Sequence, residues 1–338
     1  MKTQTYIFYA ILAAAFYALN APVSKLLLLN AEPTMMAAFL YLGAGLGMLI
    51  LSFFNRKKAS ANESLSFQHK DIPYIIGMII LDILAPIFLM FGLKTAHSAN
   101  VSLLNNFEIV ATSLIALVIF KEKISKRLWS AIALITLSSI MLSIEDPGSF
   151  QFSYGSLFVI CACICWGLEN NCTKELSHAE PRNIVIIKGF GSGFGSLLLA
   201  LAVGEHFPAI KILFLILLLG FVAYGLSVYF FVYAQRGLGA TRTSSYYAIS
   251  PFIGVLLSLI IFKSVPGTIF WIALILMAIG TYMVSTYNKK TYTFFSRQTS
   301  CTPSIPLNTQ GTIPTSVYPN FLYIALACLL VWFVSIRR

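Results

Sequence analysis

Apolar segments of transmembrane length recur along the whole of this 338-residue chain. A membrane-spanning α-helix needs roughly 20 consecutive apolar residues. The sequence has 58% hydrophobic and only 10% charged residues, and its mean hydropathy is +0.82, so it carries more apolar surface than a soluble core can bury. We therefore predict an all-α integral membrane protein with ten transmembrane helices, at about residues 6–29, 34–54, 72–91, 98–120, 127–144, 154–174, 183–203, 210–234, 243–262 and 268–287.

The net charge of +11 is explained by membrane topology rather than by a nucleic-acid partner. If the N-terminus is placed inside, 16 of the 23 Lys and Arg residues fall on the inner side, and at most six fall on the outer side. Lys188 falls within a predicted span. The positive-inside rule then predicts a cytoplasmic N-terminus. We expect a multi-pass protein of the plasma membrane, with the lipid bilayer as a partner and no nucleic acid.

The chain contains an internal repeat. Residues 31–50 and 179–198 are identical at seven of 20 positions, including an Ala-Glu-Pro start and three glycines. Further along, the pattern LxxLxIFK occurs at 114–121 and again at 256–263. Five predicted spans in each half is an odd number, so the second half enters the membrane from the opposite side. Inverted repeats with a binding site at their interface are a recurrent design of secondary transporters.

These boundaries predict the domain organisation. A first five-helix repeat covers residues 1–146 and a second covers 147–288, giving two inverted repeats. Residues 289–316 are rich in Thr, Ser and Pro, which is typical of a polar flexible linker. Residues 317–338 contain an apolar run that forms either an eleventh C-terminal span or an interfacial segment.

Several motifs resemble one family. Tyr17-Ala-Leu-Asn20 runs to a lysine in the first span, and Trp166-Gly-Leu-Glu169 does the same in the sixth. With the Ala-Glu-Pro starts and the Ile-Phe-Lys ends, they make the chain similar, over about residues 6–287, to the EamA-type proteins of the drug/metabolite transporter (DMT) superfamily. The resemblance implies ten helices and a central cavity lined by spans three, four, eight and nine with parts of one and six. It also implies transport of amino acids, sugars, nucleotide derivatives or drugs, without naming a substrate.

The chain departs from the family pattern in the fourth span. Members usually carry a proline midway along the fourth and ninth helices. Pro251 stands in the ninth run, but the fourth has Phe107-Glu108-Ile109 and no proline. The sequence therefore gives less reason to expect a kink in the fourth helix, and it places an extra acid near the expected cavity.

Polar residues of the fourth span share one side of the predicted helix. At 100° per residue they cover about a third of the circumference. Lipid-facing surfaces are not polar, so this stripe should face protein or a water-filled cavity. The stripe consists of Ser98, Ser102, Asn105, Glu108 and Thr112.

Two other acids, Asp82 and Glu169, also fall inside predicted spans. A charged group at the bilayer centre costs about 2.5–3.5 kcal/mol on insertion scales, so these groups must be paired, hydrated or protonated. One interpretation is a structural network in which Lys188 neutralises Glu169. The other is a cavity with excess negative charge, which favours a cationic substrate or proton coupling.

The second half contributes hydroxyl and tyrosine side chains to the expected cavity, rather than acids. Ser244, Tyr247, Pro251 and Gly254 share one face of the ninth helix, and tyrosines including Tyr224 mark the eighth. Tyrosines suit a ring or cationic group, but they also simply fill space. In the first helix, Asn20-Ala-Pro22 predicts a break. The candidate residues for substrate binding or coupling are Asn20, Asp82, Asn105, Glu108, Thr112, Trp166, Glu169, Tyr224, Ser244 and Tyr247.

Glycines and cysteines are interpreted as packing residues. The pairs Gly43/Gly47 and Gly191/Gly195 are small-xxx-small motifs that let helices approach closely. Four cysteines share the sixth span, but positions two apart on a helix face different directions, so core packing is favoured over a metal or redox site. We expect no metal and no cofactor.

We therefore predict a secondary transporter, an exporter of a small metabolite or drug that works by alternating access, with proton coupling as one option. A homodimer is considered as a further partner. Two alternatives stay open: a membrane receptor or scaffold without flux, and an intramembrane enzyme using paired carboxylates. The sequence has no P-loop, no HExxH and no GxSxG, so we expect no enzyme activity and no catalytic residues.

Overall fold

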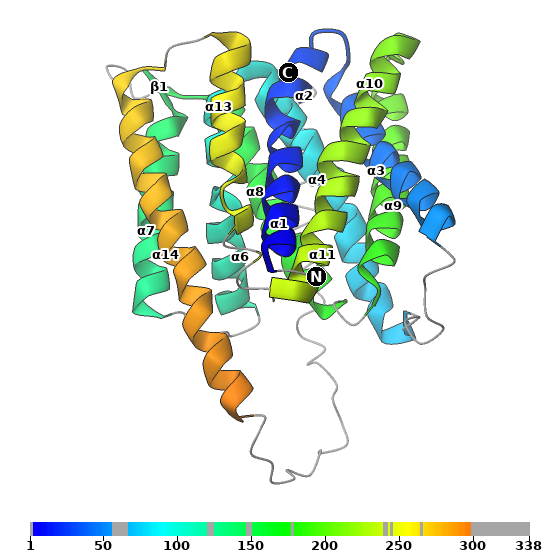
Figure 1. Cartoon of the computed structure of the whole chain (residues 1–338). Coiled ribbons are helices and arrows are strands. Elements are labelled where there is room, and N and C mark those ends of the chain that lie inside the picture. The colour runs from blue at the N-terminus through cyan, green and yellow to red at the C-terminus, as the bar shows by residue number, and fades with distance from the viewer. Residues whose placement is uncertain are drawn as a thin grey trace.

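The structure is a computed structural model that describes residues 3–55, 67–119, 125–146, 151–176, 179–238, 243, 246–263 and 266–298. Most of these residues are helical, and the helices form a bundle in which α1 runs through the middle (Figure 1). Two short antiparallel strands, β1 (Ile144–Asp146) and β2 (Gln151–Phe152), connect the two halves of the chain. They are a small addition to the predicted all-α fold.

The described parts of the ten predicted spans are mainly helical. The first half contains α1 (Thr3–Ala18), α2 (Asn20–Leu27), α3 (Pro33–Asn55), the 3-10 turn η2 (His69–Asp71), α4 (Ile72–Thr95), α5 (Ser98–Leu104), α6 (Phe107–Val118) and α7 (Lys126–Ser143). The second half contains α8 (Tyr154–Glu175), α9 (Pro181–Val203), α10 (Ile210–Gly220), the π-helical η3 (Phe221–Leu226), α11 (Ser227–Leu238), α13 (Ser250–Phe262) and α14 (Thr268–Gln298).

Seven helical segments of the described chain are long and apolar enough to cross a membrane. Two further apolar helices, Ser250–Phe262 and Thr268–Val284, are shorter. The chain is therefore a multi-pass membrane protein. The seven segments are Gln4–Leu27, Pro33–Phe53, His69–Thr95, Ser98–Val118, Tyr154–Thr173, Arg182–Val203 and Ile210–Phe231.

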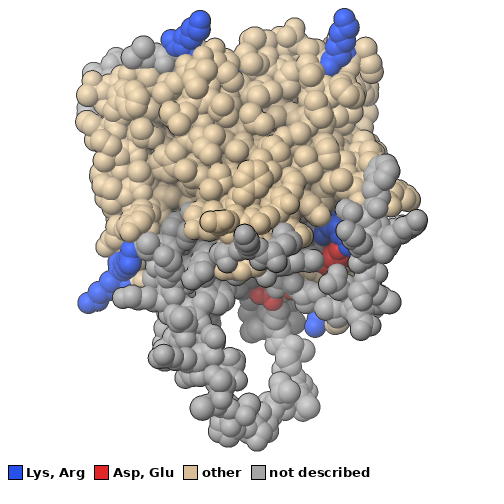
Figure 2. Space-filling view, in the orientation of Figure 1, with Lys and Arg blue, Asp and Glu red and all other residues tan. Residues whose placement is uncertain are grey.

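The outer surface of the bundle is apolar. Large hydrophobic side chains are exposed on several helices, for example Phe8, Leu198, Phe214 and Ile260. In the face seen in Figure 2, a broad band free of Lys, Arg, Asp and Glu lies between charged side chains near the two ends. A soluble monomer rarely exposes so large an apolar surface, so this band is the surface that contacts lipid.

Two predicted spans are interrupted near their middle. The first is broken between Ala18 and Asn20, as expected from Asn20-Ala-Pro22. The fourth is also broken, between Leu104 and Phe107, although it has no proline. Here the Asn106 side chain donates to the carbonyl of Leu103 at 3.2 Å. A side chain that bonds to the nearby backbone competes with the helical ladder, which explains a break that the missing proline argued against.

Helix pairing follows a regular scheme. The most extensive contacts join α4 to α8, α3 to α9, α7 to α14 and α1 to α11. Further contacts join α6 to α8, α3 to α10, α5 to α13, α4 to α9 and α1 to α13. Each half therefore packs mainly against the other half rather than against itself.

Glycines permit the closest of these approaches, as predicted. At the crossing of α3 and α9, a Cβ built on Gly189 would lie 2.6 Å from the backbone nitrogen of Gly45 and 3.0 Å from the carbonyl oxygen of Tyr41. Gly43 and Gly47 lie against α10 and η3, and Gly191 and Gly195 lie against α4. Any side chain at Gly189 would separate the two helices.

At one end of the bundle, polar contacts connect α2 to the C-terminal end of α4. The ammonium of Lys25 donates to the carbonyls of Leu93, Lys94 and Ala96, where α4 ends. Unpaired carbonyls at a helix C-terminus favour a cation. These contacts hold α2 against α4.

The C-terminal helix is longer than predicted. α14 continues to Gln298, so residues 289–298, assigned above to a flexible linker, are helical. The sequence has no proline or glycine between Gly280 and Pro303 to end the helix, and extension of an existing helix costs far less than its nucleation. Residues 299–316 of the linker and the segment 317–338 lie outside the described residues.

Candidate functional site

A cluster of charged side chains lies inside the bundle. The ammonium of Lys188 on α9 is 2.9 Å from Oε1 of Glu169 on α8 and 3.2 Å from Oδ2 of Asp82 on α4. The hydroxyl of Tyr41 donates to Asp82 Oδ1 at 3.0 Å, and Thr173 donates to Glu169. The predicted pairing of Lys188 with Glu169 is thus confirmed, and one base serves two acids. The cluster retains one negative charge when all three groups are ionised.

Glu108 lies outside that cluster and has a different partner. The side-chain amide of Asn170 on α8 donates to Glu108 Oε1 at 2.6 Å and to the hydroxyl of Thr112 at 3.3 Å. No described base forms an ion pair with Glu108. Glu108 is therefore a carboxyl group held by an amide rather than by a base.

Tyrosines and an asparagine line the space between the first and eighth spans. Asn20 donates to the hydroxyl of Tyr224 at 2.8 Å. The ring of Tyr17 lies 6.0 Å from that of Tyr224 and 5.9 Å from that of Tyr247. Tyr224 belongs to the π-helix η3, and π-helical turns occur frequently at functional sites. Tyr247 is held by Ser227, 3.3 Å between hydroxyl oxygens.

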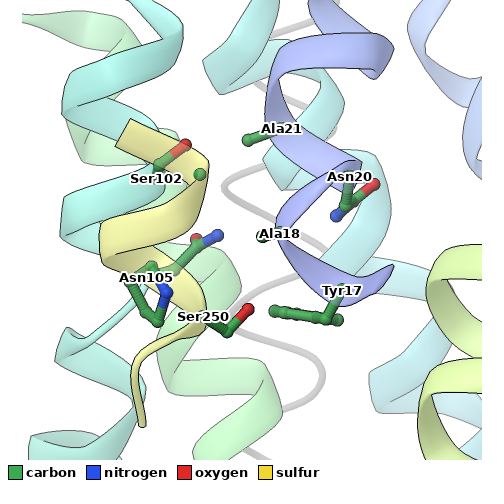
Figure 3. Close-up of a pocket in the computed structure, with 9 residues that line it drawn as sticks. Tyr17, Ala18, Asn20, Ala21, Ser102, Asn105 and Ser250 are labelled. Atoms are coloured by element: carbon green, nitrogen blue, oxygen red, sulfur yellow. The ribbon is translucent and has the colours of Figure 1, made fainter. Parts of the chain in front are cut away.

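A small pocket opens where the interrupted helices meet. It lies between the α1–α2 break, the α5–α6 break and the start of α13, and the hydroxyl of Ser250 points toward Tyr17 (Figure 3). Its lining is a mixture of small, hydroxyl and amide side chains: Tyr17, Ala18, Asn20, Ala21, Ser102, Asn105, Ser250, Pro251 and Gly254. Two predicted site residues, Asn20 and Asn105, are among them.

The polar stripe predicted on the fourth span does face protein. Ser98 bonds to Ser258 of α13 at 3.0 Å, and Ser102 lies beside Gly254 of the same helix. Beyond the break, Glu108 and Thr112 turn to α8 instead. The break at Asn105 thus lets one span contact two different partners.

The remaining predicted residues are placed as follows. Trp166 is 6% exposed and belongs to the hydrophobic core rather than to the pocket. Ser244 lies outside the described residues. Sequence reasoning did not select Tyr41, Asn170 or Ser250 as site residues. Asn170 could have been selected from the sequence, because it lies within a predicted span. A buried amide there needs a hydrogen-bond partner as much as the polar residues of the fourth span do.

The described residues were compared with the ligand sets that transition metals select. They contain no group of three or more His, Cys, Asp or Glu side chains placed to hold an ion. The cysteines of α8 are not joined in disulfides, and Cys163, Cys165 and Cys172 are buried among apolar side chains. The arrangement is instead suited to binding and releasing a small polar molecule or ion by hydrogen bonds and charge.

Comparison with known proteins agrees with this architecture. The model of the EamA-like transporter family matches residues 4–144 and again residues 153–286. The chain belongs to the EamA-like transporter family. It is therefore also a member of the DMT superfamily.

One sequence relative and one solved structure extend the comparison for this EamA-like protein. A protein of Methanothermobacter thermautotrophicus (strain Delta H), named as an uncharacterized transporter, is 24% identical over 293 residues, which cover 81% of this chain and 84% of the relative. A solved crystal structure has a TM-score of 0.57 with 16% identity and covers 89% of this chain and 99% of the other. The structural likeness concerns the fold alone.

Proposed function

We propose that this EamA-like protein is a secondary transporter that exports a small metabolite or drug across the plasma membrane by alternating access. In this proposal, ten helices form two inverted five-helix repeats, residues 1–146 and 147–288, with the N-terminus in the cytoplasm. Glu108 is the proton-coupling group, and the tyrosines and asparagines of the interior bind the substrate.

The observation that carries the proposal is an exchange symmetry in helix packing. If each helix is replaced by its counterpart in the other half, the α4–α8 contact corresponds to the α1–α11 contact. In the same way, the α6–α8 contact corresponds to the α1–α13 contact, and the α3–α10 contact corresponds to the α4–α9 contact. Three further contacts each join a helix to its own counterpart in the other half: α3–α9, α5–α13 and α7–α14. Two similar halves in opposite orientation can trade conformations, which supplies the inward-open and outward-open states.

The interrupted helices support a binding site at the centre of the bundle. Transporters place their sites where broken helices expose backbone groups near the middle of the membrane. Here the breaks at Leu19 and Asn105 and the helix start at Ser250 line one pocket.

Charge supports both the orientation and the coupling. The excess of basic residues on the predicted inner side favours a cytoplasmic N-terminus. Within the described interior, the acids Asp82, Glu108 and Glu169 outnumber the base Lys188, which favours a cationic or proton-coupled substrate. Export is proposed because the DMT superfamily includes carriers of drugs.

Counterflow in proteoliposomes tests the proposal. Vesicles containing purified protein are loaded with unlabelled amino acids, polyamines, sugars or nucleosides, and uptake of the matching labelled solute is measured. Transient accumulation of one class is expected. Flux of no class would favour a receptor or scaffold, and chemical conversion of a solute would favour an intramembrane enzyme. Reversing an imposed pH gradient separates proton coupling from simple exchange.

A further inference from the structure

Three oxygen atoms in the pocket of Figure 3 have no hydrogen-bond partner among the described residues. They are Oγ of Ser102, Oδ1 of Asn105 and Oγ of Ser250. Ser102 is 3% exposed and Ser250 is 1% exposed, so bulk water does not satisfy them. A buried polar group without a partner destabilises the folded state. Three of them around one pocket indicate that the pocket has an occupant.

The break in the first span contributes a fourth oxygen. Pro22 stands four residues after Ala18. Since proline has no N–H, the carbonyl of Ala18 lacks the donor that a continuous helix would provide. Ala18 lines the pocket, and its carbonyl oxygen is 3.4 Å from a Cβ built on Gly254. Gly254 leaves this carbonyl accessible where a larger residue would cover it.

The size and charge of the pocket restrict the occupant. Its volume is about 20 Å³, which is room for one water-sized group and not for a metabolite. The lining has no charged side chain, and Glu108 lies in the first turn of the adjoining helix α6, three residues after Asn105. The ammonium of Lys188 is already paired with two acids. Neutral oxygens near an acid that forms no ion pair with a described base attract a small cation.

We propose that this pocket is a binding site for a monovalent metal cation, Na⁺, held by Ala18 O, Ser102 Oγ, Asn105 Oδ1 and Ser250 Oγ. A divalent ion selects carboxylate ligands, which the lining lacks, and transition metals select His or Cys. Ends of half-helices and unwound carbonyls coordinate Na⁺ in other transporter architectures. The site goes beyond the proposed function, because it binds Na⁺ whether or not a solute is carried.

Thermal unfolding of the purified full chain in detergent tests the site. The melting temperature is measured while NaCl replaces choline chloride at constant ionic strength, and retention of ²²Na⁺ is measured in parallel. The wild type is expected to gain stability with saturation. Ser102→Ala and Ser250→Ala each remove one ligand without breaking a hydrogen bond, and each should raise the half-saturating Na⁺ concentration about tenfold or more.

A buried serine elsewhere provides the matched control. The hydroxyl of Ser139 donates to the carbonyl of Ile135 in its own helix, so Ser139→Ala should keep the wild-type Na⁺ midpoint. No response of the wild type to Na⁺ beyond that to choline would mean that the occupant is water, and the inference would be wrong. Unchanged midpoints in both pocket variants would place the ion elsewhere and would also overturn it.

The outcomes separate this inference from the transport proposal. If counterflow is the same in Na⁺ and in choline and Na⁺ does not stabilise the protein, the proposed cation site is wrong but the transport proposal stands. If Na⁺ stabilises the protein through Ser102 and Ser250 but no solute class shows flux, the cation site stands and the transport proposal is wrong.

Discussion

The ammonium of Lys188 lies 3.2 Å from Oδ2 of Asp82, an aspartate whose side chain has no exposed surface. The two residues come from α9 and α4, which belong to different halves of the chain. The same ammonium contacts Glu169. Three helices are therefore joined at one partly buried cation, and each acid depends on it for neutralisation.

Replacing this cation should destabilise the fold. Lys188→Met leaves two buried acids without a base, and breaking a buried ion pair on one side typically costs about 3–5 kcal/mol. We expect a loss of this order in the free energy of unfolding, measured by denaturant titration in detergent. The triple variant with Asp82→Asn and Glu169→Gln should recover most of it, since it leaves no unpaired charge. Equal instability of the triple variant would show that Lys188 acts through packing instead.

Glu108 should matter for coupling rather than for folding. Glu108→Gln keeps an acceptor oxygen for the amide of Asn170, which donates at 2.6 Å, so the melting temperature should stay close to that of the wild type. It removes the only charge at that position. We expect proteoliposome transport by Glu108→Gln to lose its response to an imposed pH gradient while counterflow persists. An unchanged response would exclude Glu108 as the coupling site.

The sequence predicted the features that depend on composition and spacing. Apolar runs located the helices, because lipid requires about 20 apolar residues per span. The glycine pairs located the tight crossings, because only a missing side chain permits such an approach. The polar stripe correctly predicted that Ser98, Glu108 and Thr112 face other helices.

Features that arise from contacts between distant helices were not predictable in the same way. Lys188 was matched to Glu169, but its second contact, Asp82, depends on how α4 crosses α9. The break at Asn105 was missed because it depends on a side-chain bond from Asn106 and not on a proline. The pocket itself depends on three helix ends that only the folded chain brings together.

The crossing of α3 and α9 should not tolerate a side chain. A Cβ at Gly189 would lie 2.5 Å from the Cα of Gly45, so Gly189→Val should destabilise the protein by about 1–3 kcal/mol through overpacking. Gly77 on α4 is the matched control, because a Cβ there would meet only Cys172 Sγ at 3.4 Å. Gly77→Ala should be neutral or add up to about 1 kcal/mol through helix propensity. Equal effects of the two substitutions on the melting temperature would contradict the tight crossing.

The contact of Lys25 with the end of α4 gives the last prediction. Its ammonium donates to three carbonyls, including those of Lys94 at 3.1 Å and Ala96 at 3.0 Å. A hydrogen bond to a charged group contributes about 1.5–3 kcal/mol, and Lys25 is partly exposed, so the lower end of that range applies to Lys25→Met. Exposed Lys211 near the start of α10 is the control, and Lys211→Met should change stability by less than about 0.5 kcal/mol. If the two variants have the same melting temperature, the carbonyl contacts do not hold α2 against α4. If only Lys25→Met melts earlier, a cysteine introduced beneath the contact should also react faster with a membrane-impermeant maleimide, because the end of α4 is then free to separate from α2.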